Sequence, residues 1–342
     1  MNLEADFRSD TLTRPTEAMR EAMARAEVGD DVFGEDPTVR ELEQLSAERV
    51  GLEAGLFVPS GTMANQIAVK LFTQPGNEII AEARSHVLTF EGGGIGLISG
   101  VQCRTLETED GVLDPGGVEA LIRADDIHLP KTALICVENT HNVAGGVVTP
   151  LATLDRLAEV ARRHAVPLHM DGARLFNAAL ADGIDAREYG SRVDLLWFAL
   201  SKGLSAPAGS VICASRERIA LCRRIRKVLG GGMRQVGILA AAGLVALEQG
   251  VDRLADDHER AARLAREVDA LPGARVDLAR TRTNIVMVEL GAGNAAYVTA
   301  ELGRRGVRAL PFGASTLRFV THREISDAGV QQAILALTEI LS

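Results

Sequence analysis

The sequence predicts an α/β protein with two domains. The first is large and contains a mostly parallel sheet of the seven-stranded type, and the second is a smaller α+β domain. Short apolar runs alternate with helix-like segments as far as Gly250. Several runs, such as Thr132–Val137 and Val193–Leu200, are continuously apolar, as in strands that are buried on both faces. After Gly250 the strand-like runs are fewer and more widely separated, which is typical of a second, smaller domain.

These changes divide the chain into an extended segment over residues 1–15, a large domain over 16–250 and a small domain over 251–342. Thr16 is a suitable N-cap for the first helix. Helices are expected where apolar residues recur at helical spacing: Thr16–Ala26, Thr38–Val50, Met63–Phe72, Leu154–Arg163, Gly172–Leu180, Arg253–Ala270, Ala295–Arg305 and Ser326–Leu341.

Strands are expected at short apolar runs that are bounded by turn-forming residues. In the large domain these runs are Gly55–Pro59, Glu78–Ala81, Gln102–Leu106, Thr132–Val137, Pro167–Met170 and Val193–Leu200. In the small domain they are Asn284–Glu289 and Thr316–Val320.

Composition excludes several classes of function. The 342 residues carry a net charge of −9 and no long basic run, which argues against nucleic acid as a partner. The four cysteines show no metal-binding spacing, so no metal is expected, and their scatter fits a reducing compartment. No apolar run reaches membrane-spanning length, and the N-terminus lacks a signal core. We therefore expect a cytoplasmic protein without a membrane partner.

Two buried strands deliver an acid and an amine to the same edge of the predicted sheet. Asp171 follows Pro167–Met170, and Lys202 follows Val193–Leu200. In an open parallel sheet, ligands bind at the carboxyl ends of the strands. This pair suits pyridoxal phosphate, whose aldehyde forms a Schiff base with a lysine and whose ring nitrogen is held protonated by an acid. Taken singly, Asp171 is better explained as a helix cap and Lys202 as a loop residue, so the remaining segments decide between the two interpretations.

Seven motifs extend this interpretation over nearly the whole chain, from Phe7 to about His322. They read RSDTLTRPT, DDVFGEDPTV, PSGTMANQIA, ENTHN, HMDGARLFNAA, SKGLSAPAGS and GGGMRQVG. In this order and combination the chain resembles the low-specificity L-threonine aldolases, pyridoxal-phosphate enzymes with the aspartate-aminotransferase fold (fold type I). The resemblance implies Lys202 as the Schiff-base lysine and Asp171 as the partner of the ring nitrogen.

The resemblance also assigns the phosphate and the two histidines. PSGTMAN reads as strand, turn and helix, and the free N–H groups at a helix start bind phosphate, so Gly61 and Thr62 are the expected seat. His86 matches a histidine that stacks on the cofactor ring and assists proton transfer. His128, in a looser motif, matches a histidine near the substrate hydroxyl. A lone histidine is otherwise more often structural.

Arginine is expected to bind the carboxylate of an amino-acid substrate, because a guanidinium donates two parallel hydrogen bonds to it. By resemblance, Ser9 and Arg318 hold this carboxylate, and Arg174 lies near both the carboxylate and the cofactor hydroxyl. The alternative for either arginine is a structural ion pair.

The basic stretch CRRIRKVLGGGMRQVG has two interpretations. A cluster of this kind is usually a solvated helix face. The resemblance instead implies that Lys227 and Arg234 reach the cofactor phosphate of a neighbouring subunit, in a homotetramer built as a dimer of dimers.

The predicted reaction is reversible retro-aldol cleavage of L-threonine, L-allo-threonine and related β-hydroxy-α-amino acids to glycine and an aldehyde, which makes the protein an aldehyde-lyase. The base is His86, His128 or a water. The alternatives are another fold-type-I enzyme, such as a β-eliminating lyase or an aminotransferase, and a non-enzymatic cofactor-binding protein. A nicotinamide enzyme is disfavoured because no GxGxxG follows a strand.

Two positions depart from the family pattern. Phe33 replaces a common tyrosine, so one phenol is absent, and Ser205 replaces a common glycine. A serine is tolerated at position 205 unless the backbone there needs a positive φ.

Overall fold

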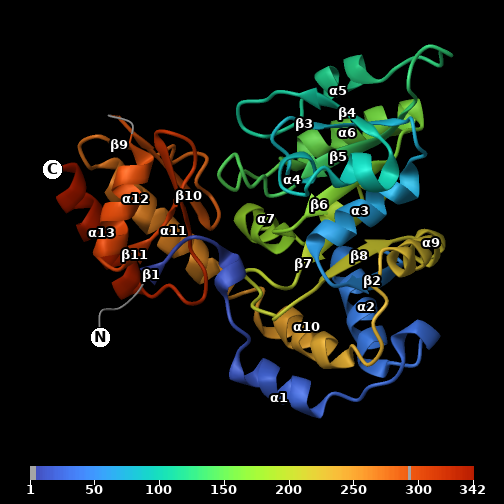
Figure 1. Cartoon of the computed structure of the whole chain (residues 1–342), viewed down its shortest axis with the longest axis horizontal. Coiled ribbons are helices and arrows are strands. Elements are labelled where there is room, and N and C mark those ends of the chain that lie inside the picture. The colour runs from blue at the N-terminus through green and yellow to red at the C-terminus, as the bar shows by residue number, and fades with distance from the viewer. Residues whose placement is uncertain (1–4, 292–293) are drawn as a thin grey trace.

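The computed structural model describes residues 5–291 and 294–342, which form two parts around separate sheets (Figure 1). The larger part contains a seven-stranded sheet with the order β2-β8-β7-β6-β5-β3-β4. Its strands are β2 (Ala54–Val58), β3 (Glu78–Glu82), β4 (Gln102–Leu106), β5 (Thr132–Glu138), β6 (Leu168–Gly172), β7 (Leu195–Ala199) and β8 (Ser210–Ala214).

The sheet is mostly parallel, as predicted. The exception is β8, which runs antiparallel to both β2 and β7. The loop from β7 to β8 therefore leaves and re-enters the sheet at the same edge, and it carries Lys202. Asp171 lies on the neighbouring strand β6, which pairs in parallel with β7. Both residues thus lie at the carboxyl edge of the parallel strands.

Helices cover both faces of this sheet because alternate strand residues are apolar on each side. Leu56 and Val58 of β2 pack toward α3 and α9, whereas Phe57 faces the core beneath α2, α6 and α10. The helices are α1 (Glu17–Arg25), α2 (Pro37–Val50), α3 (Gly61–Phe72), α4 (His86–Thr89), α5 (Pro115–Leu121), α6 (Leu151–His164), α7 (Leu175–Asp182), α8 (Arg187–Gly190), α9 (Arg216–Val228) and α10 (Gly237–Gln249).

Side-chain caps begin several of these helices, and the sequence predicts the first of them. The Thr16 hydroxyl accepts a hydrogen bond of 3.2 Å from the backbone N–H of Met19, as predicted for α1. Ser60 does the same for α3, accepting from Met63 at 3.2 Å. Each bond satisfies one of the N–H groups that a helix start leaves unpaired. The start of α3 is therefore fixed directly after β2.

The smaller part contains an antiparallel sheet with the order β12-β13-β10-β9 and three helices. Its elements are β9 (Ala274–Arg275), β10 (Ile285–Leu290), β11 (Val307–Arg308), β12 (Leu310–Pro311), β13 (Thr316–Val320), α11 (Leu254–Asp269), α12 (Ala295–Arg304) and α13 (Asp327–Leu341). A second hydrophobic core lies between this sheet and its helices.

The N-terminal segment joins the smaller part. Strand β1 (Ala5–Asp6) pairs in parallel with β11, and Phe7 is fully buried against Phe319 at 5.6 Å between ring centroids. The chain then crosses to the larger part through a short 3-10 helix, Asp10–Leu12. Of the predicted extended segment, residues 1–4 lie outside the described residues, and the domain boundaries remain a prediction.

Within residues 5–291 and 294–342, no helix combines the length and the apolar character that crossing a membrane requires.

Candidate active site

A cavity of about 280 Å³ lies at the carboxyl edge of the large sheet, where the N-terminal segment and the smaller part meet it. Two features mark it as the candidate site: it lies where open α/β sheets bind ligands, and predicted site residues from six separate segments meet in it. Those that line it are Ser9, Gly61, Thr62, His86, Arg174, Lys202 and Arg318.

Lys202 reaches the cavity from the β7–β8 loop. The Thr13 hydroxyl donates a hydrogen bond of 2.7 Å to the Lys202 carbonyl, which ties this loop to the N-terminal segment. Burial, and then the charge of Arg174, lower the pKa of the Lys202 amine. A lowered pKa increases the neutral fraction of the amine, which is the form that attacks a carbonyl.

Asp171 is 5% exposed at the end of β6 and is held by two donors. The Ala173 N–H donates to Oδ1 at 3.0 Å, and Asn65 Nδ2 donates to Oδ2 at 2.8 Å. Asn65 also donates to Glu91 at 2.7 Å, and its Oδ1 accepts from the indole N–H of Trp197 at 2.7 Å. Asn65 thus fixes the orientation of Asp171. Sequence reasoning missed this residue, although it lies in the PSGTMAN motif.

His86 faces the same group of acids. Its Nδ1 lies 2.9 Å from Glu91 Oε1, and the ligand atoms of His86, Glu91 and Asp171 all lie within 4.8 Å of one another. Burial alone would lower the pKa of His86, but the bond to Glu91 and the charges of Asp171 and Glu138 raise it.

Arg174 and Arg318 form the cationic wall. Arg174 makes a two-bond ion pair with the buried Asp10, with both N–O distances at 2.7 Å. Burial would raise the pKa of Asp10, but the charge and hydrogen bond of Arg174 lower it. Asn142 Oδ1 links the two guanidinium groups, at 3.0 Å from Arg318 Nη1 and 3.5 Å from Arg174 Nη1. Asp10 and Asn142 are site residues that the sequence did not single out.

Arg318 stands apart among the buried arginines of the described residues. Arg174 pairs with Asp10 and Arg226 with Asp31, but no carboxylate of residues 5–291 or 294–342 forms an ion pair with Arg318. Burial, and then Arg174, lower the pKa of Arg318 to about 10. A buried cation without an ion-pair partner is costly unless a ligand supplies the negative charge.

Four predicted residues do not line this cavity: Asp171, which is buried at the end of β6, and three residues that are exposed. His128 is exposed, and its backbone N–H donates to Asp126 at 2.8 Å. Lys227 is exposed near the end of α9, and Arg234 forms an exposed ion pair of 3.0 Å with Asp30. A single chain therefore does not bring these three residues to the site.

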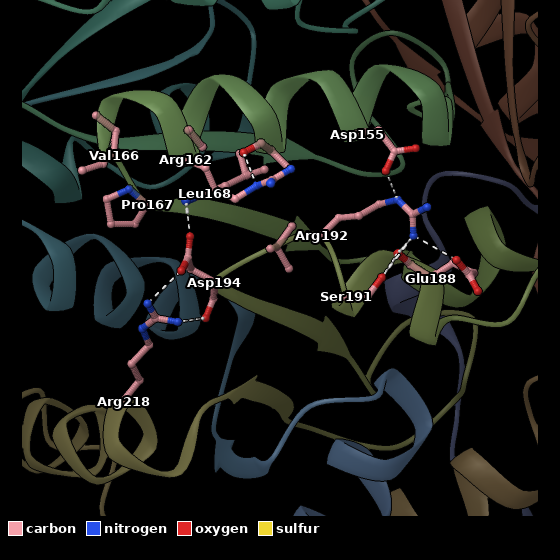
Figure 2. Close-up of a pocket in the computed structure, with 14 residues that line it drawn as sticks. Asp155, Arg162, Val166, Pro167, Leu168, Glu188, Ser191, Arg192, Asp194 and Arg218 are labelled. Atoms are coloured by element: carbon pink, nitrogen blue, oxygen red, sulfur yellow. Dashed lines mark hydrogen bonds and ion pairs between the residues drawn. The ribbon is translucent and has the colours of Figure 1, made fainter.

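A larger groove of about 700 Å³ lies at the opposite, amino edge of β6 and β7 (Figure 2). Each of its acids pairs with an arginine: Arg192 binds Asp155 and Glu188, and Arg218 binds Asp194, each at 2.9 Å or less. The groove lacks a nucleophilic amine and an unpaired acid, so we place the site in the smaller cavity.

The smaller cavity fits pyridoxal phosphate. A Cβ atom on Gly61 would lie 2.4 Å from Trp197 Cη2, so only glycine lets the start of α3 lie against the indole. Ser210 Oγ and Arg318 Nε are buried without a hydrogen-bond partner among the described residues, and both residues line the cavity. Polar atoms of this kind need a partner from a ligand.

Comparison with known proteins gives consistent matches. Residues 6–291 match the family model described as "Beta-eliminating lyase". The low specificity L-threonine aldolase of Escherichia coli (strain K12) is 42% identical over 322 residues, which cover 94% of each chain.

Two solved structures show the same fold. The threonine aldolase of Leishmania major superposes with a TM-score of 0.85 at 20% identity, covering 98% of this chain and 99% of that one. A structure of SPT with PLP superposes with a TM-score of 0.77 at 16% identity, covering 98% and 87%.

Proposed function

Because this chain belongs to the beta-eliminating lyases and, among them, to the low-specificity L-threonine aldolase family, we propose that it cleaves β-hydroxy-α-amino acids to glycine and an aldehyde. The substrates are L-threonine, L-allo-threonine and related compounds, the cleavage is reversible, and the cofactor is pyridoxal phosphate. The observation that carries the proposal is Arg318, a buried cation in the lysine-containing cavity that forms no ion pair with a carboxylate of the described residues.

Each part of the cofactor has a group of this chain to hold it. Lys202 would attach it covalently, Gly61, Thr62 and Ser210 lie where its phosphate can be bound, and Asp171 would keep its ring nitrogen protonated. When bound, the cofactor supplies an electron-accepting ring that stabilises the carbanion left when the substrate Cα–Cβ bond breaks.

The other cavity residues orient the substrate and move its proton. Arg318 and Ser9, with Arg174 beside them, would bind the substrate carboxylate and so set the rotation about Cα. His86 faces the cavity with a raised pKa, because Glu91 and the nearby acids stabilise its charged form, and this favours it as the acceptor of the β-hydroxyl proton. His128 or a water are the other candidates for this base.

The complete site would include a second copy of the chain. Lys227 lies beside Gly232 and Val32, and the surrounding surface exposes large apolar side chains, with Phe33 at 75% and Val228 at 85% exposure. Such a surface favours burial in an oligomer. We place Lys227 and Arg234 at the neighbouring subunit's phosphate in a homotetramer. A cytoplasmic location remains a prediction.

The direct test is product analysis over a panel of β-hydroxy amino acids. Threonine should yield glycine and acetaldehyde in equal amounts, and Lys202→Ala should release neither. A keto acid with ammonia would instead identify a β-eliminating lyase, and a keto acid formed only with an amino-group acceptor would identify an aminotransferase. Either result would refute the aldolase proposal.

A further inference from the structure

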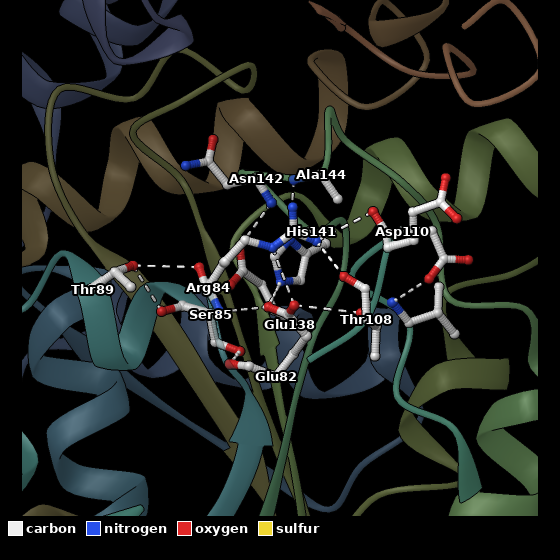
Figure 3. A network of polar contacts seen from close by, with 12 residues as sticks. Glu82, Arg84, Ser85, Thr89, Thr108, Asp110, Glu138, His141, Asn142 and Ala144 are labelled. Carbon is white, nitrogen blue, oxygen red and sulfur yellow. Dashed lines mark hydrogen bonds and ion pairs between the residues drawn. The ribbon is translucent and has the colours of Figure 1, made fainter. Parts of the chain in front are cut away.

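Glu138 is a buried acid of the cavity to which neither the resemblance nor the proposed reaction gives a role. It is the last residue of β5, pairs in register with Asp171 of β6, lines the cavity and is 6% exposed. Figure 3 shows it among the polar side chains at the carboxyl ends of β3 and β5. Both of its carboxylate oxygens accept hydrogen bonds from backbone N–H groups of cavity-lining residues.

The first of these bonds holds His86. The His86 N–H donates to Glu138 Oε2 at 2.7 Å. His86 is the first residue of α4, and the preceding residue, Ser85, makes no side-chain cap bond to that helix. Glu138 therefore satisfies, from another strand, an N–H group that the helix start leaves unpaired. Because Glu91 also binds the imidazole of His86, both the backbone and the side chain of His86 are fixed.

The second bond holds Asn142. Its N–H donates to Glu138 Oε1 at 2.8 Å, while its side-chain oxygen accepts from Arg318 and lies within reach of Arg174. Asn142 follows β5 in a loop, so its position depends on such tertiary bonds. One carboxylate thus connects the histidine of the cavity to the residue that links its two arginines.

We propose that Glu138 is a positioning residue that holds His86 and Asn142, and through Asn142 the two guanidinium groups, in their places around the cavity. The role requires two acceptor oxygens on one side chain. Glutamine has one acceptor oxygen and one NH₂ group, so Glu138→Gln must place N–H against N–H at one of the two bonds. The expected effect on glycine binding rests on the proposed function, whereas the expected effect on cofactor binding does not.

The test measures dissociation constants rather than turnover. The cofactor constant is obtained by titrating the apoprotein with pyridoxal phosphate, and the glycine constant by titrating the holoenzyme with glycine. Glu138→Gln should raise at least one of them fivefold or more. In the His86→Ala/Asn142→Ala background the same substitution should change each constant less than twofold, because the groups that Glu138 positions are absent.

Glu78→Gln is the matched control. Glu78 is fully buried and accepts hydrogen bonds from Arg123 and Thr132, but it lies at the amino end of β3, on the opposite edge of the sheet. This variant should lose thermal stability while both constants change less than twofold. If Glu138→Gln does not fold, Glu138→Asp replaces it, since its shorter side chain reaches only one amide.

Three results would overturn the proposal: unchanged constants in Glu138→Gln, the same fold-change in both backgrounds, or an equal change in Glu78→Gln. If the wild-type protein binds the cofactor but not glycine, the proposed function fails, and the cofactor constant still tests Glu138.

Discussion

At the scale of single residues, the cavity is organised by charges that lack a partner of their own. Arg318 is near Asn142, Arg174 and the face of Phe312, 5.2 Å from that ring centroid, but it forms no ion pair with an acid of the described residues. Asp171 is held by the neutral donors Asn65 and Ala173, so its charge remains available to a protonated ring nitrogen. Each charge defines a substitution whose effect can be predicted.

Arg318→Lys keeps the positive charge but removes the planar pair of donors. We expect KM for threonine to rise roughly tenfold to a hundredfold, because a charge-assisted hydrogen bond contributes about 1.5–3 kcal/mol. Steady-state kinetics measures this, with Arg260→Lys as a control at an arginine that pairs with Asp327 and does not line the cavity. An unchanged KM would remove Arg318 from the carboxylate site.

Asp171→Asn should fold, since the amide oxygen can still accept one of the two hydrogen bonds that Asn65 and Ala173 donate to Asp171, but it should lose activity steeply. An amide cannot keep a ring nitrogen protonated, and removal of a comparable charge-stabilising partner costs on the order of 3–4 kcal/mol. The measurement is kcat together with the thermal unfolding temperature. A fall in kcat of less than about tenfold, roughly 1.4 kcal/mol, would count against the role of Asp171.

At the scale of elements, the carboxyl end of β3 is joined to the loop after β5 by a buried acid–histidine pair (Figure 3). His141 Nε2 lies 3.0 Å from Glu82 Oε2, and both side chains are almost fully buried. Burial would raise the pKa of Glu82, but the hydrogen bond from His141 and the Arg84 N–H lower it to about 2. The loop that carries Asn142 is therefore held by an ion pair next to Glu138.

This shift predicts how stability depends on pH. The carboxyl of Glu82 has a lower pKa folded than unfolded, so its contribution is present above the unfolded pKa and is lost as pH falls toward 2. We expect wild-type protein to lose on the order of 3 kcal/mol more than Glu82→Gln between pH 5 and pH 2. Denaturant unfolding at several pH values measures the difference. If the unfolding free energies of the two proteins change in parallel with pH, the lowered pKa of Glu82 is contradicted.

Most elements could be predicted because their signals are local. Caps such as Thr16 and apolar runs such as Thr132–Val137 identify α1 and β5 within a residue or two. Strand β8 was not predicted, because its antiparallel place between β2 and β7 depends on partners far away in the sequence. Ser205 has a φ of 68°, so the backbone there does adopt the conformation that favours glycine.

The site residues likewise fall into those that a local sequence pattern predicts and those that depend on distant partners. Lys202, Asp171 and His86 follow strands, so their meeting at one sheet edge could be predicted. Asp10 and Arg174 are 164 residues apart, and no local pattern indicates that they pair. Glu138 and Asn65 were missed for a similar reason, because they act through hydrogen bonds to other segments.

At the scale of the whole molecule, the cavity needs at least three parts of the chain. The loop between β7 and β8 of the large sheet supplies Lys202, the N-terminal segment supplies Ser9, and the small sheet supplies Arg318. Arg234 lies outside the cavity of its own chain, on a surface with exposed apolar side chains. This placement leads to a prediction about assembly.

Mixing two defective variants should restore activity if sites are shared between subunits. Lys202→Ala and Arg234→Ala should each be inactive or weak alone. After subunit exchange, a mixed dimer would contain one native site, with Lys202 from one chain and Arg234 from the other, and activity should rise well above the sum of the parents. If exchange is verified by mass and activity stays at that sum, the shared-site proposal fails.

The pairing of β1 with β11 also determines when the cavity is completed during synthesis. Residues 5–6 leave the ribosome about three hundred residues before their partners Val307 and Arg308, and Arg318 follows later still. Until then the carboxylate-binding wall does not exist, although the large sheet and Lys202 are already made. A nascent or truncated chain that ends before β13 therefore contains Lys202 but lacks Arg318, and we expect it not to bind an amino acid at this cavity.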